Sequence, residues 1–134
     1  MKSENVEKKR RLEGRQELGK RGEEAAVAFL VGKGYRLIER NYRTRAGEID
    51  IIAFDGETLV FVEVRARTSS RQGNPFETVT RSKQEKLIKM ARWFLAARGI
   101  GSGVPCRFDV IGLLPGADGR LYPEHVTNAF QVGW

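Results

Sequence analysis

Residue types that can bind a metal ion or stabilise a phosphate lie close together in the stretch Gly47–Arg67. Its sequence, GEIDIIAFDGETLVFVEVRAR, sets Asp50, Glu63 and Arg65 among apolar residues that are typical of β-strands. An acid at such a position is informative, because an unpaired charge removed from water is costly. Two carboxylates beside a cation could hold a hard divalent ion such as Mg²⁺, which takes the rest of its ligands from water and phosphate.

The same stretch predicts a β-hairpin that brings the two acids together. Residues 55–58 contain an Asp-Gly pair, which favours a tight hairpin turn, and apolar runs flank it on both sides. With the turn there, Asp50 and Glu63 fall on adjacent strands near the same level. Glu63 and Arg65 are two positions apart and point to one face. A cross-strand ion pair between Asp50 and Arg65 is the structural alternative.

A third acid is predicted to face the sheet from a helix. Apolar residues at helical spacing predict a helix over Glu17–Lys33, which Gly34 closes as its C-cap. Glu23 borders the apolar stripe of this helix, whereas Glu24 falls on the solvent side. Residues 1–16 before it form a basic lead that carries acids as well and has almost no apolar residues. We expect this lead to be flexible, as a frayed helix or a disordered tail.

The composition is typical of one soluble globular domain, which we place at residues 17–134. The chain has 134 residues, of which 40% are hydrophobic and 31% charged. No apolar run reaches membrane-spanning length, and no apolar segment follows the charged N-terminus as in a secretory signal. The single cysteine, Cys106, excludes an internal disulfide and a cysteine-rich zinc site, so the expected location is the cytoplasm.

The net charge of +7 is concentrated just after the predicted hairpin. Residues 65–92 contain eight basic side chains and two acidic ones. A basic excess beside a candidate metal site favours a polyanion as the ligand, and here nucleic acid. The side chains predicted to contact it are Arg67, Arg71, Lys83 and Lys86. A solvated helix face is the alternative that this pattern leaves open.

The rest of the chain predicts further strands, a loop and a second helix. In chain order these are a strand over Tyr35–Asn41, a turn over Tyr42–Ala46, a loop over Thr68–Pro75, a helix over Thr80–Arg98, a strand over Cys106–Leu114 and a weaker strand over Arg120–Val126. Phe130 and Trp134 are expected to pack on the core. His125 is interpreted as structural, and Asp109 as an ion-pair partner of Arg107.

The order helix, three strands, helix, strand resembles the PD-(D/E)XK or restriction-endonuclease-like nuclease fold. The spacing of Glu23, Ile-Asp50-Ile and Val-Glu63-Val-Arg65 is most similar to archaeal Holliday-junction resolvases. The whole chain is also similar to the YraN-type family of uncharacterised bacterial proteins, through GEEAAVAFLVGKGY, ERNYRTRAGEIDIIA, LVFVEVRAR, RFDVIGL and NAF. The resemblance implies an α/β fold with a mixed central sheet flanked by helices, an α-β-β-β-α-β core.

The resemblance also implies a site for Mg²⁺ or Mn²⁺. Its ligands would be the side chains of Glu23, Asp50 and Glu63 and the backbone carbonyl of Val64. Arg65 stands where the nuclease pattern has lysine, and arginine stabilises charge but does not give up its proton near neutral pH. Three alternatives follow: Arg65 acts only as an electrostatic clamp, a neighbour such as Lys83 replaces the lysine, or catalysis is lost.

The expected function is therefore a metal-dependent endonuclease that hydrolyses phosphodiester bonds in DNA, with Glu23, Asp50, Glu63 and Arg65 as catalytic residues. No base-reading motif is visible, so we expect selectivity for branched or flapped DNA rather than for a sequence. Resolvases of this fold act as dimers, and the resemblance therefore implies a homodimer. The alternatives are a non-catalytic nucleic-acid-binding module that retains the nuclease fold, and an interaction subunit for a protein partner.

Overall fold

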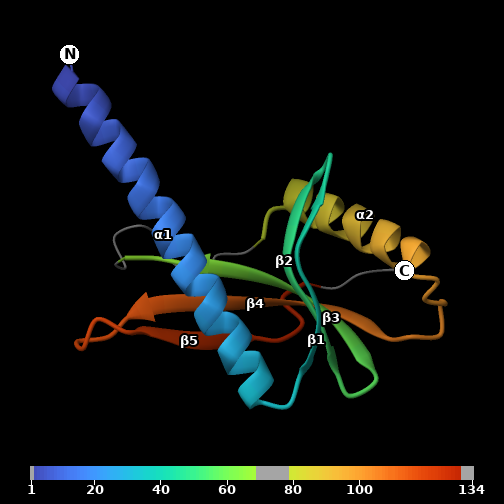
Figure 1. The fold of residues 1–134 in the computed structure, drawn as a ribbon. Helices are drawn as coiled ribbons and strands as arrows, with labels where there is room; N and C mark the ends of the chain where they lie inside the picture. Colours follow the sequence, from blue (N-terminus) through green and yellow to red (C-terminus); the bar gives the residue numbers. More distant parts are fainter. Residues whose placement is uncertain (1, 69–78, 131–134) are drawn as a thin grey trace.

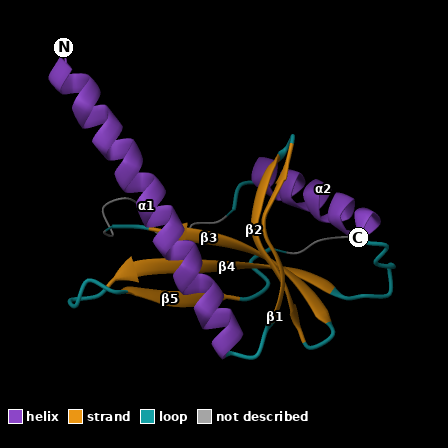
Figure 2. Cartoon of the chain, viewed as in Figure 1, coloured by secondary structure: helices purple, strands orange, loops and turns teal. Residues whose placement is uncertain are grey.

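The computed structural model describes residues 2–68 and 79–130, and it confirms the predicted mixed sheet flanked by helices (Figures 1 and 2). The elements are α1 (Lys2–Gly32), β1 (Arg36–Thr44), β2 (Gly47–Asp55), β3 (Thr58–Ala66), α2 (Arg81–Ala97), β4 (Cys106–Pro115) and β5 (Leu121–Val126). Of the sequence predictions, Arg71, Trp134 and most of the loop over Thr68–Pro75 lie outside the described residues.

The strands form one sheet in the order β1-β2-β3-β4-β5. Only β3 and β4 run parallel, and α2 supplies the crossover that a parallel pair requires. Ala26 and Leu30 of α1 pack on one face of the sheet, and Met90 and Phe94 of α2 pack on the other. The protein is therefore a three-layer α/β/α structure with a hydrophobic core on each side of the sheet.

The β2–β3 hairpin has the predicted turn. Asp55 pairs with Thr58, and Gly56 between them has a φ of 58°, which a glycine adopts without strain. The pairing continues to Ile51 opposite Val62. Asp50 and Glu63 are the next residues on their strands, so the hairpin brings the two predicted acids to the same level.

Strand β1 is longer than predicted. It continues to Thr44, so the turn expected over Tyr42–Ala46 is wrong for its first three residues. Tyr42 is held in the strand because its ring packs edge-on against Phe94, with centroids 5.3 Å apart. Arg43 pairs across the sheet with Glu48 at 3.5 Å, an ion pair that stabilises the strand pairing rather than a turn.

Helix α1 begins at Lys2, so the residues before the predicted start at Glu17 continue the same helix. Their flexibility stays a prediction. At the other end, Gly34 has a φ of 90° and the Tyr35 N–H donates to the Leu30 carbonyl at 3.0 Å. This closure confirms the predicted C-cap, because only glycine takes that backbone conformation readily.

Helix α2 is fixed at its start by an N-cap at Thr80. The Thr80 hydroxyl accepts a hydrogen bond from the Lys83 N–H at 3.2 Å. Gly99, with a φ of 65°, ends the helix, and the Ile100 N–H donates to the Leu95 carbonyl at 2.9 Å. The cap holds the first turn, and with it the position of Lys83.

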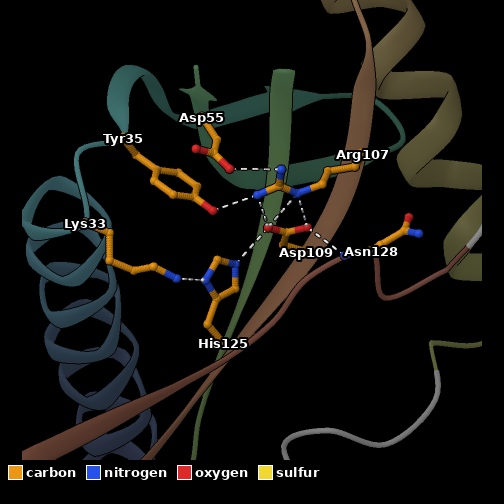
Figure 3. A network of polar contacts seen from close by, with 7 residues as sticks. All are labelled: Lys33, Tyr35, Asp55, Arg107, Asp109, His125 and Asn128. Carbon is orange, nitrogen blue, oxygen red and sulfur yellow. Dashed lines mark hydrogen bonds and ion pairs between the residues drawn. The ribbon is translucent and has the colours of Figure 1, made fainter. Parts of the chain in front are cut away.

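A polar network centred on Asp109 ties β4 to β5 and to the end of α1 (Figure 3). The Asp109 side chain is fully buried and accepts hydrogen bonds from Arg107 at 3.0 Å, from His125 at 2.7 Å and from the Asn128 N–H at 2.9 Å. Lys33 lies 3.0 Å from the other ring nitrogen of His125. The predicted Arg107–Asp109 pair is confirmed, and His125 has a partner in Asp109 that the sequence pattern did not indicate.

The same network extends to the hairpin turn. Arg107 also reaches Tyr35 at 2.6 Å and Asp55 at 3.1 Å, so one guanidinium joins three parts of the chain. Burial by itself raises the pKa of Asp109, but the hydrogen bonds from His125, Arg107 and Asn128 outweigh it and hold the pKa below the usual value.

Replacing Asp109 with alanine is expected to lower the free energy of unfolding by about 3 to 5 kcal/mol, because it removes the fully buried acceptor of Arg107, His125 and the Asn128 N–H. Since the folded pKa is depressed, the stabilisation is present above the unfolded pKa and is lost as the pH falls toward the folded value. Urea unfolding measures the loss. Asp118→Ala, at an exposed turn carboxylate, is the control and should have a much smaller effect. Equal losses in the two variants would contradict the structural role of the network.

Candidate functional site

The regular alternation of side chains between the two faces of the sheet is broken in strand β1 at Asn41, which has a φ of 54°. In a regular strand, residues two apart point to the same face. Here Arg40 points toward α1 and binds Glu23, whereas Tyr42 packs against Phe94 of α2. Asparagine tolerates left-handed backbone better than most residues. Asn41 therefore permits a change of face within a continuous strand.

Strand β2 changes face at the same level. Ile49 packs in the hydrophobic cluster beneath α2 and Ile51 in the cluster beneath α1, although they are two residues apart. The register of their neighbours places Asp50 opposite Asn41. Asp50 thus lies at the distortion and belongs to neither hydrophobic layer.

The Asp50 carboxylate replaces a backbone contact between β2 and β3. Its Oδ2 accepts a hydrogen bond from the Val64 N–H at 2.8 Å, beyond the last paired residues of the two strands. This bond satisfies a backbone donor that would otherwise be left without a partner. It also turns the backbone of Val64 toward Asp50, although the predicted role of the Val64 carbonyl as a metal ligand stays a prediction.

The surroundings of Asp50 disfavour its charge. The pKa of Asp50 is raised to about 6, mainly by burial and also by the charges of Glu63, Glu48 and Glu23, while the Val64 hydrogen bond opposes the rise. Within the described residues Asp50 makes no ion pair. The structural alternative, an ion pair between Asp50 and Arg65, is absent there, and Arg65 instead lies 3.2 Å from Glu63.

Two cations hold Glu63 on the α2 side of β3. Arg65 is one, and the Lys83 ammonium, from the first turn of α2, is the other. The side chains of Glu63 and Arg65 are only 11% and 12% exposed, whereas that of Lys83 is 50% exposed. Lys83 therefore reaches Glu63 from the solvent side.

Glu23 is held by the distorted part of β1. The Asn41 amide donates to its Oε1 at 2.9 Å and the Arg40 guanidinium lies 3.2 Å from the same oxygen. Arg40 also binds Glu24 at 2.9 Å, and Glu24 is exposed as predicted. Arg40 and Asn41 are functional candidates that sequence reasoning missed. A left-handed asparagine inside a strand has no distinct pattern, so the only signal was an Asn in a run of strand-forming residues.

The three predicted acids influence one another, but each has its own partners. Glu23 and Glu63 both contribute to the electrostatic potential at Asp50. No group of three or more histidine, cysteine or carboxylate side chains is arranged to hold a metal within residues 2–68 and 79–130. Metal binding at these acids would thus require Glu23 or Glu63 to exchange a basic partner for the ion.

The predicted nucleic-acid contacts lie beside the acids. Arg67 directly follows β3, with its N–H bonded to the Leu113 carbonyl at 3.0 Å. Lys83 and Lys86 are exposed on α2. Arg71 lies outside the described residues. Arg67 is half-buried, and the binding of nucleic acid by these side chains stays a prediction.

Comparison with known sequences assigns this chain to a protein family. A profile of the uncharacterised protein family UPF0102 matches residues 22–113, which include all three predicted acids. The chain belongs to this family. It is 50% identical over 115 residues to the UPF0102 protein STH1475 of Symbiobacterium thermophilum, covering 86% of this chain and 97% of that protein. A UPF0102 protein of Chlorobium limicola is 54% identical over 119 residues, which cover 84% of this chain and 91% of the relative.

Membership in UPF0102 confirms the predicted YraN-type resemblance over most of the chain. The relatives carry no activity in their names, so the chemistry of this UPF0102 protein must be argued from its own residues. In the part of the chain that the structure describes, neither helix is long and apolar enough to cross a membrane.

Proposed function

We propose that this UPF0102 protein is a metal-dependent endonuclease that hydrolyses phosphodiester bonds in cytoplasmic DNA and prefers branched or flapped structures. The observation that carries the proposal is Asp50, a partly buried acid whose pKa is raised to about 6 by burial and, to a smaller extent, by the charges of Glu63, Glu48 and Glu23. Such an acid is costly to ionise until a cation arrives, and acids perturbed in this way concentrate at functional sites. Cutting both strands of a junction symmetrically requires two copies, so we include a homodimer in the proposal.

The donor chemistry fits Mg²⁺ or Mn²⁺. Carboxylate oxygens are the ligands that hard cations prefer, and among residues 2–68 and 79–130 Asp50 is the one acid of the three that has no basic partner to give up. Glu63, Glu23 and the Val64 carbonyl would complete the protein ligands. The ion, when bound, would neutralise phosphate oxygens and lower the pKa of a bound water.

The two cations at Glu63 have different tasks in this proposal. Arg65 keeps its charge and stabilises the negative charge that develops on the phosphate. A lysine, unlike an arginine, can exchange a proton with water or substrate. Lys83 therefore takes the role that lysine has in the nuclease pattern. Both contact the carboxylate that would face the metal, and in this proposal they would therefore lie beside the reacting phosphate.

A non-catalytic DNA-binding module is the second candidate. It is favoured by the ion pairs of Glu63 with Arg65 and Lys83, which neutralise this acid without a metal. The basic side chains on α2 would then bind the phosphate backbone, and the acids would serve only the fold.

Cleavage of labelled four-way-junction, flapped and linear DNA decides between the two candidates. We expect cleavage of the branched substrates with Mg²⁺ or Mn²⁺, none with EDTA, and none in Asp50→Asn. Circular dichroism must show that this variant is folded. Binding of DNA by the wild type with no cleavage in either metal would contradict the endonuclease and support the binding module.

A further inference from the structure

The N-terminal part of α1 leaves the body of the protein as a helical arm, which we define as residues 3–16. All of its side chains are exposed, and Figure 1 shows it projecting past the sheet. The whole helix has 31 residues, so at 1.5 Å per residue it is about 46 Å long. The arm is continuous with the segment that carries Glu23, and its direction is therefore fixed relative to the candidate site.

One face of α1 changes character where the sheet ends. Gly22, Ala26 and Leu30 face the sheet, and a Cβ on Gly22 would lie 2.6 Å from that of Ala66, the last residue of β3. Residues that follow one another at steps of three, four or seven lie on the same face of a helix. Counting back from Gly22, successive steps of seven, four and three residues lead to Arg15, then Arg11, then Lys8. The inner face is therefore apolar over the sheet and basic beyond it.

The inner face of the arm lies beyond the end of β3 that carries the site. Ala66 contacts α1 one residue after Arg65 and three after Glu63. Helical spacing puts Glu13, the one acid between Lys8 and Arg15, on the outer face. The basic side chains from Lys8 to Arg15 thus lie beyond this end of β3 on the α1 side of the sheet, with no acid between them on that face; Glu4, one turn before Lys8, is the acid of the arm that shares it.

The cationic side chains of the inner face have no interaction partner among the described residues. Lys8, Arg11 and Arg15 are exposed and make no ion pair or side-chain hydrogen bond with residues 2–68 or 79–130. A helix that buries no surface gains little stability from packing. A polyanion along this face would complement its charge and order it.

We propose that Lys8, Arg11 and Arg15 bind the phosphate backbone of DNA that flanks the site. This inference rests on the proposed function, because it takes DNA as the ligand. Arg11 precedes Glu23 by twelve residues, or about 18 Å along the helix axis. At 3.4 Å per base pair, the arm reaches phosphates roughly five base pairs from the site. It contributes only when the duplex extends that far.

The test compares two triple variants with the same charge change on opposite faces of α1. The inner variant is Lys8→Gln, Arg11→Gln, Arg15→Gln, and the outer variant is Lys9→Gln, Arg10→Gln, Lys20→Gln. Glutamine has nearly the helix propensity of lysine and arginine, and circular dichroism checks the helix content. Fluorescence anisotropy in EDTA gives Kd for short and long duplexes, about 8 and 30 base pairs, at several salt concentrations.

For the long duplex, the inner variant is expected to raise Kd at least tenfold and to reduce the salt slope by about 2 to 3, close to 0.9 for each lost phosphate contact. The short duplex should show little difference between the inner variant and the wild type, and the outer variant should stay within about threefold of wild type for both.

Equal changes of Kd in the two variants would overturn a specific contact by the inner face of the arm. The net charge of the protein would then be sufficient to explain the loss of affinity. Wild-type binding that the inner variant does not weaken would overturn this inference while the proposed function stands. A wild type that neither binds nor cleaves DNA would overturn the proposed function and this inference with it.

Discussion

Replacing Asp50 with asparagine is expected to raise the free energy of unfolding of the metal-free protein by about 3 kcal/mol near pH 8. This follows because each unit of pKa shift corresponds to about 1.4 kcal/mol, and the Asp50 pKa rises from 3.8 to about 6. Asparagine has the same shape, and its side-chain carbonyl can still accept the Val64 N–H. The variant therefore removes a costly charge and keeps the local hydrogen bond.

The sign of the pH dependence is fixed by the direction of the shift. Between the unfolded and folded pKa values, the folded wild type binds more protons than the unfolded chain, so its stability falls as the pH rises. The difference between Asp50→Asn and the wild type should be small below about pH 4 and should reach its full value above about pH 7. Urea unfolding at a series of pH values measures this difference curve.

Glu57→Gln provides the control for this experiment, because Glu57 is an exposed carboxylate in the turn of the same hairpin. Because the Glu57 side chain is exposed, its replacement should change the free energy of unfolding little. A flat difference curve for Asp50→Asn would mean that Asp50 is an ordinary surface acid. The main support for a metal site would then be removed.

Replacing Lys83 with glutamine is expected to separate metal binding from catalysis. Removing the ammonium frees Glu63 from a competing cation, so Mg²⁺ should bind more tightly, by about fivefold if the half-exposed pair is worth about 1 kcal/mol. The single-turnover cleavage rate at saturating DNA should fall by about 100-fold or more, because a positioned proton-transfer group is lost. Calorimetry and quenched-flow cleavage measure the two effects.

Lys86→Gln makes the same charge change nearby on α2, and Lys86 is exposed without a carboxylate partner in the described structure. It should weaken DNA binding slightly and leave the rate at saturation unchanged. Wild-type cleavage by Lys83→Gln would exclude Lys83 as the replacement for the missing lysine. An unchanged Mg²⁺ affinity would show that its ion pair with Glu63 does not compete with the metal.

Local sequence chemistry was sufficient for the parts of the fold that depend on near neighbours. The Asp-Gly pair and the apolar runs beside it determine the β2–β3 hairpin, and thus the common level of Asp50 and Glu63. Thr80 and Gly34 determine helix ends in the same way, because a cap needs only adjacent residues.

The partners of the acids depend on distant packing and could not be predicted in the same way. Lys83 reaches Glu63 only because α2 crosses over β3, and the nineteen residues between them carry no periodic signal for that contact. The change of face at Asn41 arises from two strands that distort together, so neither strand alone reveals it. Without this change, Arg40 would have been expected on the face of Tyr42 and not beside Glu23.

The most direct test of the account is calorimetric titration of the wild type with Mg²⁺ and Mn²⁺ near pH 6, in two buffers of different ionisation enthalpy. We predict one ion per chain and a release of roughly half a proton on binding, because about half of the Asp50 carboxyls are protonated at their pKa. Asp50→Asn should abolish both. No binding of either ion at about 10 mM, or equal binding by Asp50→Asn, would contradict a metal site at Asp50.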